Sequence, residues 1–436
     1  MKKIMNNKVS KIFNIVSMKK YEKLKKRYLK LEKNYKNLKA SNEEILKDIY
    51  ANNSNLFSKN YIKKSSREFE RKKNDPKLIP FYLPQFHTIP ENDKWWGGKG
   101  FTEWTNVTQG QPQFVGHYQP HLPDELGFYD LDNTKIFKEQ VSLAKKYGVY
   151  GFCFHYYWFS GGKRLLEKPI FNYLNDKSLD FPFMLCWANE PWSRRWDGSE
   201  DDILIDQKFE ESDIKKFIKD IMPFLKDKRY IKVNNCPILI IYRPHFFSKD
   251  MMLKMSEIWR EYGKREGFDD LYLLHTRTGG FESNSLDWGG FDGELEFPPN
   301  NISYRDTLNN EKIINPNFKG RIFDLPKIVM KNFIDIQENE NLYKTVLPSW
   351  DNTARKKNNG HVYYNSSPDF YKKWLSNAIK KTEKIHPDNK IVFINAWNEW
   401  AEGAHLEPDK KYGFAYLEAT LDALLENRSN SSKILK

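Results

Sequence analysis

The chain has 436 residues, of which 39% are hydrophobic and 15% aromatic, so it can hold one large enzyme domain and an appendage. Residues 1–75 carry 22 Lys and Arg against 8 Asp and Glu, a net charge of +14, whereas residues 76–436 carry 49 basic and 50 acidic residues. The nearly neutral main body argues against a nucleic-acid partner, which requires a basic face.

The N-terminal region predicts a basic helical arm. Residues 18–50 have coiled-coil spacing, and their apolar positions are Leu24, Tyr28, Leu31, Tyr35, Leu38, Ile45 and Ile49. The stripe and the surrounding lysines predict either self-association or contact with an anionic membrane surface, and a solvated helix is the alternative. We therefore predict an arm and linker over residues 1–75 and a catalytic domain over residues 76–436.

The N-terminus offers little support for export or membrane insertion. The apolar stretch at residues 12–16 is too short for a signal-peptide core, and no run approaches about 18 apolar residues. The three cysteines form no CxxC pair, which indicates free thiols in a reducing compartment. We expect a cytoplasmic protein, with the arm as a possible peripheral attachment to the inner membrane.

After residue 78 the pattern becomes short apolar strands separated by longer segments, several of which are amphipathic helices. The predicted strands are Ile79–Leu83, Val149–His155, Pro182–Trp187, Pro237–Tyr242, Leu271–His275, Phe291–Phe297, Thr345–Trp350 and Lys390–Trp397. The predicted helices are Asn133–Tyr147, Phe209–Leu225, Met251–Glu266, Pro368–Ile385 and Phe414–Leu425. This alternation predicts an α/β fold, a (β/α)8 TIM-type barrel; a doubly wound open sheet is the alternative but lacks its usual phosphate loop.

Nucleotide and metal motifs are absent. The sequence has no GxxxxGK[ST], no GxGxxG after a strand, no HExxH and no Cys/His set with zinc spacing. Asp130 and Asp132 have the DxD form of some metal-dependent sugar-nucleotide transferases, but they precede a helix, where Asp residues are ordinary caps. We therefore predict no cofactor and no metal.

Aromatic and polar residues recur at the ends of the predicted strands, where barrel enzymes keep their sites. Aromatic faces pack on sugar rings, and carboxylates, amides and imidazoles bind sugar hydroxyls, so the pattern predicts an oligosaccharide or polysaccharide substrate. The candidate substrate-binding residues are His87, Trp96, Glu103, His155, Tyr157, Trp187, Asn189, Glu190, Trp196, Trp350 and Asn398.

Glu399 and Glu402 form the candidate catalytic pair. If the chain turns after Trp397, residues three apart come to lie roughly 5–6 Å from one another. Two carboxyls that close suit glycosidic chemistry, because one donates a proton while the other assists at the sugar. Their mutual repulsion also raises one pKa toward neutrality.

Three motifs resemble the WbsX-type family. They are Phe81–His87, the Trp-Ala-Asn-Glu-Pro-Trp run at 187–192, and Asn-Glu-Trp-Ala-Glu-Gly at 398–403 with Glu407 and Pro408. Members of that family are described as glycosyltransferases of bacterial lipopolysaccharide or O-antigen assembly. The family in turn resembles glycoside hydrolase family 99, the endo-α-mannosidases, which are retaining (β/α)8 enzymes.

The family 99 resemblance implies roles for the two glutamates. Glu399 deprotonates a sugar 2-hydroxyl, which closes onto the anomeric carbon, and Glu402 is the acid/base at the leaving oxygen. We expect a retaining glycan-active enzyme, a transferase or an endo-glycosidase, of bacterial cell-surface polysaccharide synthesis. The alternatives are a divalent-metal sugar-nucleotide transferase and a non-catalytic glycan-binding barrel.

Overall fold

The computed structural model describes residues 18–37, 40, 61–96, 98–193, 203–205, 209–278, 288–300, 302, 307–308, 311–335 and 340–434. The chain divides into two compact units, residues 1–56 and 57–436. In the first unit, residues 18–37 are helical and exposed apart from the half-buried Glu32. The predicted positions Leu38, Ile45 and Ile49 lie outside the described residues. No described helix has the length and apolar character needed to cross a bilayer.

The second unit is a closed barrel of eight parallel strands in chain order, which confirms the predicted (β/α)8 fold. Its strands are β1 (Lys77–Tyr82), β2 (Phe152–Phe159), β4 (Phe183–Trp187), β8 (Cys236–Ile241), β9 (Tyr272–Thr276), β10 (Gly293–Leu295), β12 (Leu342–Val346) and β15 (Ile391–Ile394). Strand β1 pairs with both β15 and β2, and this closes the sheet. Every residue of β4 and β15 is buried, as expected for strands covered on both faces.

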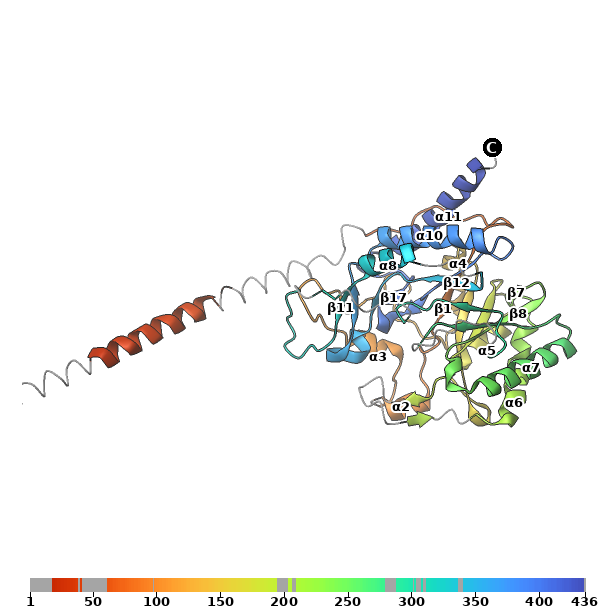
Figure 1. Cartoon of the computed structure of the whole chain (residues 1–436), viewed down its shortest axis with the longest axis horizontal. Helices are drawn as coiled ribbons and strands as arrows, with labels where there is room; N and C mark the ends of the chain where they lie inside the picture. Colours follow the sequence, from red (N-terminus) through yellow and green to blue (C-terminus); the bar gives the residue numbers. More distant parts are fainter. Residues whose placement is uncertain are drawn as a thin grey trace, which may run out of the picture. The chain divides into compact units, whose positions relative to one another are not determined.

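Helices surround the barrel (Figure 1). They are α4 (Lys135–Lys146), α5 (Lys168–Asn175), α6 (Glu211–Leu225), α7 (Lys249–Arg265), α8 (Leu325–Asp335), α10 (Pro368–Ile385) and α11 (Ala415–Ile434). Helices α10 and α11 lie side by side, and the hydroxyls of Tyr371 and Thr420 are hydrogen-bonded at 3.1 Å between them. The connection from β9 to β10 contains no helix among its described residues.

Shorter elements lie in the loops. The helices are α2 (Pro90–Trp95), α3 (Glu103–Thr108) and α9 (Thr353–Lys356), and the 3-10 turns include η5 (Trp400–Glu402). The strands are β3 (Lys163–Leu165), β5 (Trp192–Ser193), β6 (Ile203–Ile205), β7 (Lys232–Val233), β11 (Ile322–Asp324), β13 (Trp350–Asp351), β14 (Val362–Tyr364), β16 (Asn398–Glu399) and β17 (Ala404–His405).

The seventh barrel strand differs from its prediction. It was expected over Thr345–Trp350 and occupies Leu342–Val346. Lys344 breaks the apolar run in the sequence, but in the barrel it is buried, and its Nζ lies 2.8 Å from Glu296 Oε1. This ion pair lets a charged residue occupy a buried strand. Because β12 ends at Val346, Trp350 lies after the barrel strand, in β13.

The connector before β1 packs on the barrel unit. The backbone of Ile62 bonds to Tyr412 at 3.1 Å and to Phe414 at 2.8 Å, and Phe69 is buried in the core. Gly148 ends the turn after α4 with φ of +82°, and a Cβ there would lie 2.9 Å from the Phe69 ring. Residues 61–75 therefore pack within the same compact unit as the barrel, Phe57–Lys436.

Candidate active site

A buried arginine holds three carboxylates at the C-terminal end of the barrel. Arg355 Nη2 lies 2.8 Å from Glu399 Oε1, Nη1 lies 2.7 Å from Glu402 Oε1, and Nε lies 2.7 Å from Glu103 Oε1. The guanidinium is 4% exposed. Glu103 follows β1, whereas Glu399 and Glu402 follow β15. We call Glu103, Glu399, Glu402 and Arg355 the carboxylate cluster, and it exists only in the folded barrel.

A tight hairpin presents the two glutamates of the predicted pair. Strands β16 and β17 are antiparallel, with Asn398 opposite His405 and Glu399 opposite Ala404. The turn between them is the 3-10 element η5, and it ends at Gly403 with φ of 59°, a left-handed conformation that favours glycine. The chain therefore turns after Glu399 instead of continuing as a strand. Both carboxylates contact Arg355 as a result.

Arg355 is positioned by the loop after β12. Asp351 Oδ1 accepts hydrogen bonds from the Thr353 backbone N–H at 2.9 Å and from its hydroxyl at 2.7 Å, at the start of α9. The other oxygen of Asp351 lies 2.6 Å from His117 Nε2 and 2.7 Å from Gln119 Nε2. These contacts fix α9, which carries Arg355.

Glu399 and Glu402 have different surroundings. Glu402 is 22% exposed and accepts a bond from Trp350 Nε1 at 3.3 Å, whereas Glu399 is 11% exposed. Burial raises the pKa of Glu399 to about 7; Arg355 opposes this shift, and the charges of Glu402 and Glu103 add to it. Glu399 Oε2 is buried and has no hydrogen-bond partner among the described residues. Glu399 is thus poised to exchange a proton near neutral pH.

The raised pKa of Glu399 predicts a pH-dependent stability. The folded state binds this proton more tightly than the unfolded chain, so its contribution is complete below about pH 4.5 and is lost as pH rises through about 7. Relative to Glu399→Gln, wild type should lose about 2.5 kcal/mol of unfolding free energy between pH 5 and pH 8. Urea unfolding at both pH values measures this difference. The exposed Glu261→Gln should follow wild type, and parallel behaviour of Glu399→Gln and wild type would contradict the assignment.

A second buried carboxylate supports the hairpin. Glu407 accepts hydrogen bonds from Trp400 Nε1 at 2.7 Å, Tyr129 Oη at 2.8 Å and Gln140 Nε2 at 2.7 Å. Burial raises the pKa of Glu407 to about 7, and these donors oppose the shift. Because Gln140 lies on α4 and Trp400 lies between the two glutamates, this network ties the hairpin to the barrel wall.

Five of the predicted substrate-binding residues lie at or near the carboxylate cluster. Glu103 belongs to the cluster, and Trp350 Nε1 donates to Glu402. The pKa of His155 is raised overall: burial acts to lower it, but the hydrogen bond to Cys186 and the charges of Glu399 and Glu402 outweigh burial. Burial and the charge of Glu399 hold the pKa of Tyr157 well above its usual value. Glu190 follows β4 and Arg243 follows β8, and Glu190 Oε1 lies 2.6 Å from Arg243 Nε.

Four other predicted residues are structural. Trp187 is fully buried and packs 4.5 Å from the Phe217 ring of α6, so it faces the helices and not the barrel mouth. The amide of Asn189 is used by the Arg243 backbone, with both bonds at 2.7 Å, and that of Asn398 by the Leu83 backbone at 2.7 and 3.0 Å. His87 is 1% exposed, with Nδ1 2.9 Å from the Pro84 carbonyl. All four side chains are buried and contact other parts of the protein.

The remaining predicted residues are apart from the cluster or outside the description. Trp96 is half-buried after α2, with its ring 6.4 Å from that of Phe101. Trp196 lies outside the described residues. The Asp130 and Asp132 carboxylates serve local structure: Asp130 Oδ1 accepts the Asp132 N–H at 2.8 Å, and Asp132 Oδ2 lies 2.6 Å from Lys168 Nζ.

Sequence reasoning missed Arg355, the centre of the cluster. It begins an Arg-Lys-Lys run, and its neighbours Lys356 and Lys357 are exposed, as charge runs usually are. The available signal was its position five residues after Trp350, in a loop following a barrel strand, where functional side chains gather.

Three comparisons with known proteins bear on this site. The family described as "Glycosyltransferase WbsX" matches residues 78–420. The "Uncharacterized protein WxcX" of two Xanthomonas campestris pv. campestris strains, B100 and ATCC 33913, is 43% identical over 348 residues, which are 80% of this chain and 49% of each relative. The chain thus spans about half the length of the curated relatives it matches.

Solved structures share the barrel. A glycoside hydrolase-like protein aligns with a TM-score of 0.53 at 15% identity, covering 84% of this chain and 98% of that one. The GH99 endo-alpha-mannosidase from Bacteroides thetaiotaomicron aligns with a TM-score of 0.51 at 14% identity, covering 81% and 98%. At such identities the likeness concerns the fold alone.

Proposed function

Because the chain belongs to the WbsX glycosyltransferase family, we propose that it is a glycan-active enzyme whose chemistry is carried by Glu399 and Glu402. The observation that carries this proposal is the shared guanidinium of Arg355, which holds both carboxylates in one site. The buried, unpartnered Oε2 of Glu399 supplies an acceptor for a substrate proton in the described part of the site. Glu402 is the more exposed of the two, and we assign it the acid/base role at the leaving oxygen.

In the first step, Glu399 Oε2 accepts the proton of the sugar 2-hydroxyl, and the 2-oxygen bonds to the anomeric carbon from the face opposite the leaving group. The glycosidic C–O bond breaks as Glu402 transfers its proton to the departing oxygen. The product is a 1,2-anhydro sugar, and the two glutamates have exchanged protonation states. This geometry requires a glycoside whose 2-hydroxyl is trans to the leaving group.

In the second step, Glu402 accepts a proton from an incoming hydroxyl, which attacks the anomeric carbon. The bond from the 2-oxygen to that carbon breaks, and Glu399 returns its proton to the 2-oxygen. Two inversions give net retention. Water as the incoming hydroxyl gives hydrolysis, and a second glycan gives transfer, so one site serves both reactions. We place the activity in bacterial cell-surface polysaccharide or O-antigen synthesis, in keeping with the family.

The pKa of Glu399 supports its role as the base. Burial together with the charges of Glu402 and Glu103 raises the pKa of Glu399 to about 7, although Arg355 opposes the shift. Ionised Glu399, the form that accepts the 2-hydroxyl proton, therefore exchanges with its protonated form near neutral pH, and a carboxylate of raised pKa is a stronger base than an ordinary one.

The experiment that tests the proposal is incubation of the full chain with α-mannosides and lipid-linked O-antigen repeats, read by mass spectrometry. We expect cleavage or transfer with retained anomeric configuration. Saturable binding without turnover on any glycan would instead identify a glycan-binding barrel. Activity that depends on a nucleotide sugar and Mn²⁺ would instead point to Asp130 and Asp132. None of the contacts described for the carboxylate cluster involves these two residues.

We also propose that the N-terminal arm controls location or association and takes no part in the chemistry. Residues 18–37 hold nine Lys and Arg against two Glu. Its apolar side chains are exposed; Leu24, Tyr28, Leu31 and Tyr35 are each more than half accessible. A basic helix with exposed Leu and Tyr suits an anionic lipid surface, and pairing with a second copy is the other reading.

A chain beginning at Phe57 tests this role. It should keep the unfolding temperature and the turnover of the full chain on a soluble glycan, because residues 61–75 still pack on the barrel. It should lose binding to anionic liposomes or lose oligomerisation, measured by sedimentation. A chain beginning at residue 76 is the matched comparison and should unfold at lower temperature, since it lacks Phe69 and the Ile62 backbone bonds. Unchanged liposome binding and oligomeric state in the Phe57 chain would contradict the proposal.

A further inference from the structure

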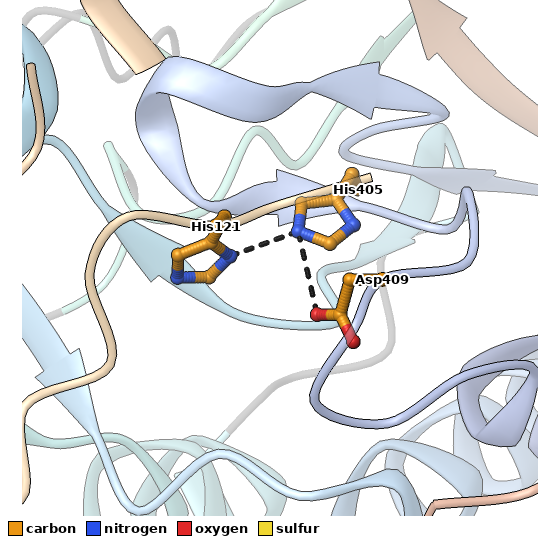
Figure 2. A group of neighbouring side chains, drawn as sticks. All are labelled: His121, His405 and Asp409. Atoms are coloured by element: carbon orange, nitrogen blue, oxygen red, sulfur yellow. Dashed lines mark hydrogen bonds and ion pairs between the residues drawn. The ribbon is translucent and has the colours of Figure 1, made fainter. Parts of the chain in front are cut away.

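A group of two imidazoles and a carboxylate lies beside the hairpin that carries Glu399 and Glu402, and neither the proposed reaction nor the comparisons use it (Figure 2). His121 Nδ1 lies 2.8 Å from His405 Nε2, which lies 3.8 Å from Asp409 Oδ2. The three ligand atoms all lie within 4.8 Å of one another, and all three residues are buried. The sequence did not reveal this group, because His121 is far from the other two along the chain.

The hydrogen bonds of His405 fix which ring nitrogen is available. Its Nδ1 lies 3.0 Å from the backbone carbonyl of Glu407, and a carbonyl oxygen only accepts, so Nδ1 carries the hydrogen. Nε2 therefore presents its lone pair toward His121 and Asp409. A metal-binding histidine commonly has this arrangement, in which the second ring nitrogen donates to a carbonyl that orients the ring.

The carboxylate of Asp409 is buried, and the charge of nearby Lys411 acts on it without a direct ion pair among the described residues. Asp409 is 2% exposed, and its Oδ1 accepts the backbone N–H of Tyr412 at 2.6 Å. Its Oδ2 faces His405, and no Lys or Arg of the described residues forms an ion pair with it. Buried carboxylates are usually paired or bind a metal, because taking an isolated charge out of water is costly.

We propose that His121, His405 and Asp409 form a binding site for a divalent transition-metal ion of the Zn²⁺ class. In a tetrahedral site with ligands ~2.0–2.2 Å from the ion, ligand atoms stand roughly 3.3–3.6 Å apart. The separations of 2.8 and 3.8 Å lie on either side of that range, and the His121 and Asp409 atoms lie within 4.8 Å of each other, so binding an ion draws the three side chains together. Two imidazoles and one carboxylate select such a metal over Mg²⁺, which prefers oxygen ligands.

The surroundings supply rigidity and a fourth position. Backbone bonds join the two segments that carry the ligands: Lys410 N–H to Leu122 O at 2.9 Å and Asp124 N–H to Pro408 O at 2.9 Å. A cavity of about 210 Å³, lined by His121 and Asp409 among others, admits a water or a small anion as the remaining ligand. The site therefore needs little rearrangement to bind an ion.

The metal's role is to fix the catalytic hairpin. The His405 ring stacks on Trp400 with centroids 3.8 Å apart and planes at 15°, and Trp400 lies between Glu399 and Glu402. An ion joining His405 to His121 would anchor β17 to the segment before α4. This role rests on the proposed function, whereas the metal site itself does not, because no step of the proposed reaction passes through the ion.

Metal binding to the full chain tests the site. After removal of metal with a chelator, we expect Zn²⁺ to bind at one ion per chain by mass spectrometry and calorimetry and to raise the unfolding temperature. Asp409→Asn keeps the side-chain size and the bond from Tyr412, so the fold should persist. This variant should bind Zn²⁺ at least ~100-fold more weakly and lose the rise in unfolding temperature. His386→Gln, at the end of α10, is the matched control and should behave as wild type.

Metal bound elsewhere on the protein can be distinguished from metal bound at His121, His405 and Asp409. Co²⁺ bound at this site gives a spectrum without a thiolate charge-transfer band, which Cys236 or another thiol would produce. If Asp409→Asn proves unstable, His121→Asn replaces it in the same measurements. Absence of stoichiometric Zn²⁺ binding, or binding that both variants retain, would overturn the proposal. Because metal content is measured without substrate, including in the Glu402→Gln variant, failure of the proposed reaction leaves this test intact.

Discussion

Glu399→Gln and Glu402→Gln should each lower turnover on a natural glycan by about 10²–10⁴-fold, the usual contribution of a general acid or base. Gln keeps the size of the side chain, and one of its polar atoms still faces Arg355, but it neither accepts nor donates the titrating proton. Binding of the glycan should persist, because Tyr157, Trp350 and the other aromatic side chains of the site are unchanged. Initial rates and equilibrium binding measured in parallel separate the two effects.

The leaving group distinguishes the two glutamates. A glycoside with a good leaving group departs without protonation, so it should restore much of the activity of Glu402→Gln and little of Glu399→Gln. Glu103→Gln is the matched control, because Glu103 contacts the same guanidinium of Arg355 but has no role in the proposed proton transfers, and its loss of activity should be smaller. Full activity of both Glu399→Gln and Glu402→Gln would exclude the mechanism.

The barrel could be predicted because its strands are buried on both faces and leave apolar runs in the sequence. Helix α10 occupies Pro368–Ile385 as predicted, because Ser367 caps it by accepting the Phe370 N–H at 3.2 Å and proline stands at its first position. Helices α5 and α8 were missed. The seventh strand was misplaced because a long-range ion pair with Glu296 buries Lys344, and local sequence carries no sign of such a pair.

In the candidate site, too, features that depend on local sequence could be predicted, and features that depend on the folded barrel could not. The proximity of Glu399 and Glu402 depends on a local turn, which their spacing and Gly403 indicate. The roles of Trp187 and Asn398 depend on which way a side chain points at a strand end. Trp187 pairs with Tyr156, and both face the surrounding helices, whereas the neighbouring His155 stacks on Phe81 inside the barrel. A tryptophan that binds a sugar and a tryptophan of the core look the same in the sequence, so the residue type alone does not distinguish the two roles.

Replacing Arg355 by Met should lower both stability and activity. The guanidinium is buried against three carboxylates, and removal of one partner from a buried ion pair typically costs about 3–5 kcal/mol. The loss should be largest at pH 8, where the carboxyl groups are ionised and repel one another, and small near pH 4, where protonation removes the repulsion. Urea unfolding across this range measures the effect. Arg243→Met, which removes the ion pair with Glu190, is the matched control and should show a weaker pH dependence.

The pH dependence of turnover gives the sharper result for Arg355. In wild type, Arg355 lowers the pKa of Glu399 against the effect of burial. Without it the pKa of Glu399 rises further, by roughly 1–3 units for an opposite charge at this distance. Glu399 must be ionised to accept the 2-hydroxyl proton, so the acid limb of the pH–rate profile should move to higher pH by that amount. Arg355→Lys keeps the charge but cannot bind three carboxylates in one plane, so its acid limb should lie between those of wild type and Arg355→Met. An unshifted limb in a folded Arg355→Met variant would show that Glu399 is not the base.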